Sequence, residues 1–146
     1  MSGKFIEQHF NMNKRRQKLG APPGSVVFTG NFSDAEVAIH YFQYDQQKAE
    51  RLSFQHQNDH VFPVDSDAVN WYDIKGIHDT KLIKEIGARF NIHPLVLEDI
   101  TDIRQRPKFD EYEEGLFFII KALQFESEAF TIHKEHIGIY MTENLV

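Results

Sequence analysis

The pattern of apolar and polar positions predicts a chain of strands with two helices near its centre. Apolar side chains occur on both faces of the stretch 37–42, which is typical of a strand covered on both sides. A polar turn at 45–47 separates it from 51–55, which is predicted to return as its antiparallel partner. The other predicted strands are 25–29, 69–74, 108–112, 116–125 and 130–141.

The first predicted helix follows Asp79, whose side-chain oxygen is suited to cap a helix N-terminus. Its apolar positions fall within about 100° of one another at helical spacing, which predicts one buried face. These positions are Leu82, Ile83, Ile86 and Phe90. Asn91 is expected to end the helix, because asparagine tolerates the left-handed backbone conformation found there.

The second predicted helix begins at Pro94, since a proline in the first helical turn loses no hydrogen bond. Val96, Ile100 and Ile103 are spaced to share its buried face. Pro107 is expected to end the helix, because the residue before a proline avoids the helical region.

Three carboxylates of this second helix form the best candidate for chemistry. Glu98, Asp99 and Asp102 span about a 100° sector beside the buried face. Oxygen ligands suit hard cations such as Mg²⁺, which keep several waters and need few protein carboxylates. The alternative is that these acids form a solvated helix face or pair with Arg104 and Arg106.

The remaining candidate residues give weaker support for a metal or ligand site. His56 and His60 lie four residues apart in a polar stretch with a proline, and no third zinc ligand has a suitable spacing. His133 and His136 would point to opposite faces of a strand. Trp71 is expected to anchor the core or a sheet face rather than to serve as a ligand platform.

Composition narrows the classes of protein. A chain of 146 residues suits one domain that buries roughly 70% of its unfolded surface. The absence of cysteine excludes disulfides and thiolate nucleophiles, and a net charge of −6 argues against a general nucleic-acid binder. No Gly-x-Ser-x-Gly elbow or phosphate-binding loop is present, so a nucleophilic or nucleotide-dependent enzyme has little support. We expect that the protein is not an enzyme.

The first 24 residues are predicted to be a basic, partly irregular arm ahead of a body formed by residues 25–146. Its basic residues are Lys4, Lys14, Arg15, Arg16 and Lys18, and Gly20-Ala21-Pro22-Pro23-Gly24 closes it. We interpret the arm as a solvated terminus, with contact to anionic lipid headgroups as the alternative. The longest apolar run, 116–120, is far shorter than the about 20 residues of a bilayer crossing.

The last residues predict a turn at 142–144 followed by the apolar pair Leu145-Val146. A chain that stops as a strand begins is expected to be a piece of a longer protein.

Several motifs resemble the signature of the CorA family of magnesium and cobalt transporters. They are Gly76-Ile77-His78-Asp79, Ile92-His93-Pro94-Leu95-Val96-Leu97-Glu98-Asp99-Ile100 and Gln105-Arg106-Pro107-Lys108. The resemblance implies the amino-terminal cytoplasmic domain of such a transporter, truncated before the stalk and transmembrane helices. The implied fold is α/β, an α/β/α sandwich around a mixed, largely antiparallel β-sheet.

The same resemblance implies a metal-sensing role in a pentameric channel at the cytoplasmic face of the inner membrane. Regulatory Mg²⁺, with Co²⁺ as a substitute, would bind between subunits through Asp99 and Glu98, with Asp102 as a secondary candidate. Bound metal would stabilise the closed pentamer, with partner ligands on a stalk beyond residue 146. The piece itself is expected to be soluble, able to exist as a monomer and linked to the membrane only through its missing part.

The sequence departs from the family pattern at Arg104, where the family often has histidine before Gln-Arg-Pro, so a cation stands at one possible metal contact. Two alternative functions stay open. This region does not decide the transported ion, and the cytoplasmic domain of a related zinc transporter fits as well. A metal-dependent hydrolase using Glu98, Asp99 and Asp102 is the third reading, for which no general base or substrate pocket is evident.

Overall fold

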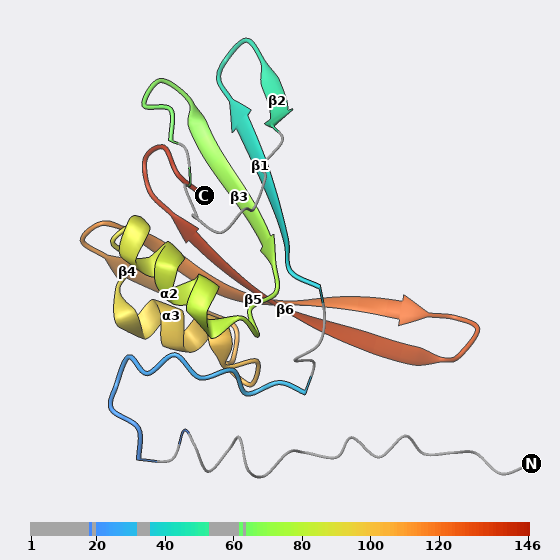
Figure 1. Cartoon of the computed structure of the whole chain (residues 1–146). Coiled ribbons are helices and arrows are strands. Elements are labelled where there is room, and N and C mark those ends of the chain that lie inside the picture. The colour runs from blue at the N-terminus through green and yellow to red at the C-terminus, as the bar shows by residue number, and fades with distance from the viewer. Residues whose placement is uncertain (1–17, 19, 32–35, 53–61, 63) are drawn as a thin grey trace, which may run out of the picture.

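The computed structural model describes residues 18, 20–31, 36–52, 62 and 64–146. In this part of the chain, two three-stranded antiparallel sheets lie beside a pair of helices (Figure 1). The first sheet, in the order β2-β1-β3, contains β1 (Ala38–Tyr44), β2 (Ala49–Leu52) and β3 (Val69–Lys75). The second, in the order β4-β5-β6, contains β4 (Lys108–Tyr112), β5 (Gly115–Glu126) and β6 (Thr131–Met141).

The end of the chain joins the two sheets. After β6 the backbone N–H of Thr142 donates to the carbonyl of Leu145 at 2.8 Å, which closes a turn. The chain then runs parallel to β3, with Val146 N–H donating to the Asn70 carbonyl and Tyr72 N–H donating to Val146, at 2.8 and 2.9 Å. The predicted extended pair at 145–146 is thus confirmed, and the pairing as a whole is mixed but largely antiparallel.

Helix α2 (Thr80–Arg89) forms for the reasons that its sequence predicts. The Asp79 carboxylate accepts from the backbone N–H groups of Lys81 and Leu82 at 3.1 and 3.0 Å. Asn91 has a φ of 51°, the left-handed conformation expected just beyond the helix end. The predicted apolar stripe faces the interior.

Helix α3 (Pro94–Thr101) begins at the predicted proline but ends earlier than predicted. His93 caps its N-terminus, because a ring nitrogen accepts from Leu95 N–H at 3.2 Å. The helix ends at Thr101 because Asp102 takes an extended backbone conformation, and its carboxylate binds the Arg104 N–H at 3.2 Å. Ile103, predicted on the buried helical face, therefore lies outside the helix and is exposed.

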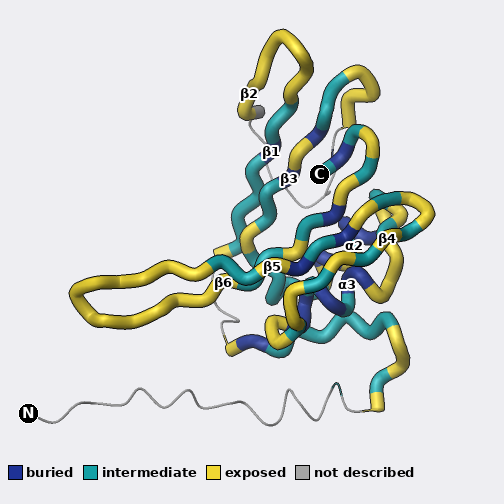
Figure 2. Tube along the Cα trace, turned by 180° about the vertical axis from the view of Figure 1, so that it is seen from behind, coloured by how far each residue is buried: buried dark blue, intermediate teal, exposed yellow. Residues whose placement is uncertain are grey.

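The hydrophobic core has two parts that meet where α2 packs against α3. The first part lies between α2 and the first sheet and contains Tyr41, Phe62, Tyr72, Leu82, Ile83, Ile86, Leu97 and Leu145. The second lies between α3 and the second sheet and contains Val96, Phe117, Ile119 and Tyr140. Figure 2 shows the buried segments gathered here, whereas the far end of the β5–β6 hairpin is exposed. The core thus holds α3 on two faces, with Leu97 in the first part and Val96 in the second.

One expectation beside the first sheet is wrong, because residues 25–29 form no strand and Thr29 N–H instead donates to the Thr101 carbonyl at 3.1 Å. Trp71 takes the sheet-face position of the two that were expected: it lies against Phe42 with ring centroids 5.6 Å apart and is 47% exposed. Phe62 lies in a polar stretch without helix or strand, yet it is only 1% exposed.

The pairing of β1 with β2 and the strands β3 to β6 are confirmed, with shifts of a few residues at their ends. The predicted histidine pair His56 and His60 lies outside the described residues. The mixed α/β class is also confirmed, whereas the α/β/α sandwich stays a prediction.

Candidate functional site

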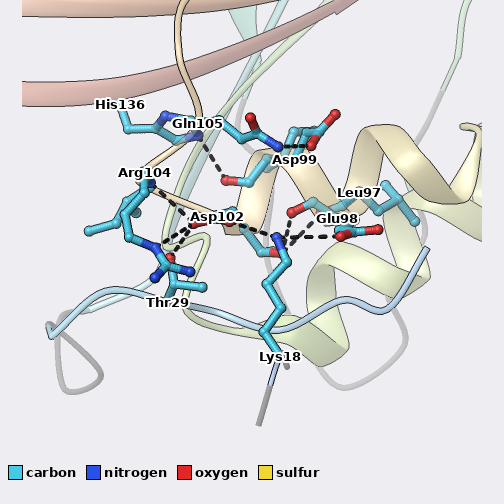
Figure 3. Close-up of polar contacts among 12 residues, drawn as sticks. Lys18, Thr29, Leu97, Glu98, Asp99, Asp102, Arg104, Gln105 and His136 are labelled. Carbon is cyan, nitrogen blue, oxygen red and sulfur yellow. Dashed lines mark hydrogen bonds and ion pairs between the residues drawn. The ribbon is translucent and has the colours of Figure 1, made fainter. Parts of the chain in front are cut away.

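The three carboxylates of α3 do not form a solvated face. Asp99 and Asp102 are each only 8% exposed, and Glu98 is half-buried. Their side chains leave the last helical turn and its cap in different directions (Figure 3). Each carboxylate has a cationic partner, which is Lys18 for Glu98 and Asp102 and Lys108 for Asp99. The interpretation of Asp99 and Asp102 as solvent-exposed acids is wrong, while the alternative pairing of Asp102 with Arg104 occurs.

Glu98 receives the end of the basic arm. The backbone N–H of Gly24 donates to Glu98 Oε2 at 2.7 Å, and Lys18 Nζ lies 3.4 Å from Glu98 Oε1. Gly24 has a φ of 83°, and an added Cβ would lie 2.8 Å from Pro94 Cβ. Only glycine lets the backbone approach α3 this closely. The interaction therefore depends on a glycine 74 residues away in sequence.

Asp102 is held by donors from three segments. Lys18 Nζ donates to Asp102 Oδ2 at 2.6 Å, and Thr29 Oγ1 donates to Oδ1 at 2.7 Å. Arg104 adds its backbone N–H and its Nε, at 3.2 and 3.1 Å. Burial alone would raise the pKa of the Asp102 carboxyl, but these donors outweigh it and hold the pKa far below its usual range. Asp102 is thus a charged structural group under most conditions.

Asp99 is held by a different set of donors from those that hold Asp102. The side-chain amide of Gln105 donates to Asp99 Oδ1, and Lys108 Nζ lies 2.7 Å from Oδ2. The same ammonium group also contacts the carboxylate of Asp110. Burial would lower the pKa of Lys108, but the carboxylates of Asp110 and Asp99 raise it above its ordinary value. Lys108 therefore stays protonated between two acids.

An open depression of about 640 Å³ connects two of the three candidates. Its lining residues are Ala21, Pro23, Leu95, Glu98, Asp99, Lys108, Asp110, Glu111 and Tyr112. Asp102 does not border it. The structure therefore brings Glu98 and Asp99 to one accessible surface and separates Asp102 from them.

His136, which its spacing with His133 did not favour as a metal ligand, has a structural role. Its Nε2 donates to the Ile100 carbonyl at 3.1 Å, and its Nδ1 lies 2.6 Å from Lys121 Nζ. Since an ammonium can only donate, we assign Nδ1 as the acceptor and the ring as neutral. Burial and the Lys121 charge lower the pKa of His136 accordingly. His133 contacts Glu126 instead, so the two rings share no site.

The chemistry of Glu98 and Asp99 suits Mg²⁺, but only as part of a site. Among the described residues, no three histidine, cysteine, aspartate or glutamate side chains converge to hold a metal ion. Mg²⁺ keeps several waters and commonly uses one or two protein carboxylates. The carboxylate oxygens at the depression fit that requirement, with any further protein ligand coming from outside this set of residues.

Comparison with known proteins places the chain in a family. The family described as CorA-like Mg²⁺ transporter protein matches residues 66–146, more than half of the chain. This chain belongs to the CorA family. The match contains both helices, the second sheet and all three candidate carboxylates.

Two transport proteins are similar to half of the chain or more. The cobalt/magnesium transport protein CorA of Thermotoga maritima is 32% identical over 131 residues, which cover 88% of this chain and 36% of that protein. YfjQ of Bacillus subtilis, named as a candidate metal ion transporter, is 36% identical over 78 residues, covering 52% of this chain and 22% of YfjQ. The chain thus spans about a third or less of these relatives. None of the helices that the structure describes is long and apolar enough to cross a membrane.

The sequence pattern did not predict several residues that hold the site carboxylates. Lys18 and Gly24 come from the predicted arm and Lys108 from a predicted strand, and Gln105 lies between α3 and β4. Composition gave one signal, because the basic arm precedes an acidic body and the two attract each other. Nothing local identified which acid each cation would contact.

Proposed function

We propose that this chain is the metal-sensing regulatory domain of a CorA-like divalent-cation transport protein. Membership of the CorA family supports the class of protein. The observation that carries the regulatory role is the position of Asp99. It is a largely buried carboxylate with one oxygen fixed by Gln105 and the other directed to a cation beside an open depression.

In this proposal Asp99 and Glu98 supply one half of a Mg²⁺ site between neighbouring subunits of a pentamer, and Co²⁺ can replace Mg²⁺. The metal supplies positive charge between two acidic faces. Asp99 and Glu98 bind the metal, because their carboxylates border the same depression. Asp102 holds the arm and the end of α3 in place. A ligand shifts a conformational equilibrium only by its differential affinity, so metal between subunits favours the closed pentamer.

The proposal also assigns the parts of the chain. Residues 1–24 form the arm, which fastens to α3 through Lys18 and Gly24, and residues 25–146 form the body of the domain. The stalk and transmembrane helices would follow residue 146, with this domain on the cytoplasmic side of the inner membrane. Helices from the rest of the protein would complete the α/β/α sandwich.

Protection of the full-length protein from proteolysis by Mg²⁺ tests this function. We expect Mg²⁺ to slow cleavage, and Asp99→Lys to raise the Mg²⁺ concentration for half-protection by at least about tenfold, because it replaces a ligand by a cation. Glu128→Lys is the matched control, since it makes the same charge change at an exposed position of the β5–β6 turn. An unchanged midpoint in Asp99→Lys would exclude Asp99 as a sensing ligand.

A further inference from the structure

We propose that Lys108 is a built-in competitor for the cation at Asp99. Its ammonium group contacts both Asp99 and Asp110, and it gives up Asp99 and keeps Asp110 when a divalent cation binds. Lys108 thereby sets the metal concentration to which the domain responds. This inference rests on the proposed function, because it concerns the regulation of the same carboxylate.

The geometry places Lys108 between two carboxylates of unequal accessibility. Lys108 and Asp110 are two residues apart on β4, so their side chains leave the same face of the strand. The ammonium lies 2.7 Å from Asp99 Oδ2 and contacts Asp110 as well. The side chain of Asp99 is 12% exposed and that of Asp110 is 37% exposed, so Asp110 is the partner nearer to solvent.

Release of Asp99 requires the movement of one flexible side chain. Lysine has four rotatable bonds and a compact charge, so the ammonium can leave Asp99 and keep its contact with Asp110 without moving the backbone. Gln105 continues to donate to Asp99 Oδ1 and keeps the carboxylate in its orientation. The oxygen that Lys108 leaves, Oδ2, belongs to a residue that lines the open depression. A cation arriving from that side thus meets an oriented carboxylate.

Lys18 is not placed to compete with a metal ion at the depression. It contacts Glu98 and Asp102, and it is absent from the residues that line the depression. Its closer contact, at 2.6 Å, is with Asp102, which lies away from the accessible surface. Lys18 is therefore suited to fasten the arm, and Lys108 to compete at the metal-binding carboxylate.

Competition lowers the apparent affinity of the metal by the fraction of molecules in which Asp99 is free. An ion pair that is partly exposed shifts such an equilibrium by roughly fivefold or less. The Mg²⁺ concentration for half-protection should therefore change by a similar factor when Lys108 is removed. The direction is an increase in metal affinity, the opposite of the effect expected from the loss of a structural contact.

The test is a Mg²⁺ titration of protease protection in the full-length protein, with two substitutions of opposite effect. Lys108→Met keeps the aliphatic stem and removes the ammonium, and we expect the midpoint to fall by about three- to fivefold. Asp110→Asn removes the alternative partner of Lys108, and we expect the midpoint to rise by about twofold or more. In the Lys108→Met background, Asp110→Asn should have a smaller effect, which isolates the coupling between the two side chains.

Lys81→Met on α2 is the matched control, because it removes one positive charge from a side chain that is 86% exposed and far from Asp99 in sequence. Lys108→Gln is a second variant that retains a polar end, and thermal unfolding without Mg²⁺ checks the folding of each protein. A midpoint that is unchanged or higher in both Lys108 variants would overturn the inference. If Asp99→Lys still abolished protection in that case, the proposed function would stand; if Asp99→Lys had no effect, the proposed function would fail as well.

Discussion

At the scale of single residues, Asp99 and Asp102 differ in their surroundings although they are three positions apart. Asp102 receives charged and neutral donors from Lys18, Thr29 and Arg104, which satisfy both of its oxygens. Asp99 receives the side-chain amide of Gln105 and the ammonium of Lys108, and it borders the depression. The same residue type therefore serves a structural role at one position and a candidate ligand role at the other.

Asp102→Asn should destabilise this chain by about 2 kcal/mol at neutral pH, because hydrogen bonds to a charged group are stronger than neutral ones. The folded pKa of Asp102 lies below its unfolded value of about 3.9. Its contribution is thus complete above about pH 4 and is lost as pH falls toward the folded pKa. Urea unfolding between pH 7 and pH 3 measures both effects, and the variant should lose less stability than the wild type on acidification.

The Mg²⁺ midpoint of Asp102→Asn should stay within about twofold of the wild-type midpoint, since Asp102 does not border the depression. A large rise in that midpoint, without loss of folding, would instead assign Asp102 to the metal site.

At the scale of elements, α3 depends on its close contact with α2. Gly87 lies in α2 at a position where an added Cβ would overlap Leu97 of α3. Leu97 is itself a core residue. The absence of a side chain at Gly87 therefore lets α3 approach α2 and fixes the helix that carries the three acids.

Gly87→Ala should destabilise the chain by about 1 kcal/mol, because overpacking outweighs the gain in helix propensity. Lys84→Ala, at an exposed position of the same helix, should change stability by less than about 0.5 kcal/mol. Urea unfolding of both variants measures the difference. A more stable Gly87→Ala protein would mean that Leu97 moves aside freely and that the contact does not position α3.

The elements also show which features a sequence determines locally. Asp79, Asn91 and Pro94 act through their own backbone neighbourhood, so both helix starts and the end of α2 could be predicted. Residues 25–29 have strand-like side chains but no strand partner, because Thr29 pairs with the end of α3 instead. Phe62 is buried by residues distant in sequence, which a local polar pattern does not reveal.

The candidate site also has features that the local sequence determines and features that depend on distant residues. The three acids could be found because they are spaced on one helix, and the family resemblance singled out Asp99 and Glu98. Their cations could not be assigned, since Lys18 lies 84 residues from Asp102 and Gly24 lies 74 residues from Glu98. Separating Asp102 from the accessible pair required the position of every neighbouring segment.

At the scale of the whole molecule, the chain provides one side of a proposed shared site. It covers 36% of the Thermotoga maritima relative, and its acids have no converging third ligand among the residues that the structure describes. Under the proposed function, an intersubunit metal would use the carboxylates that are held in fixed orientations at the accessible depression. The response to metal would then be a property of the assembly.

Anomalous diffraction from crystals of the full-length protein grown with Co²⁺ tests the central claim most directly. We predict a metal peak in direct contact with Asp99 Oδ2 and shared with a neighbouring subunit, and we expect the Lys108 ammonium to lie with Asp110 alone. A metal peak elsewhere in the protein, with Lys108 still paired to Asp99, would contradict the account.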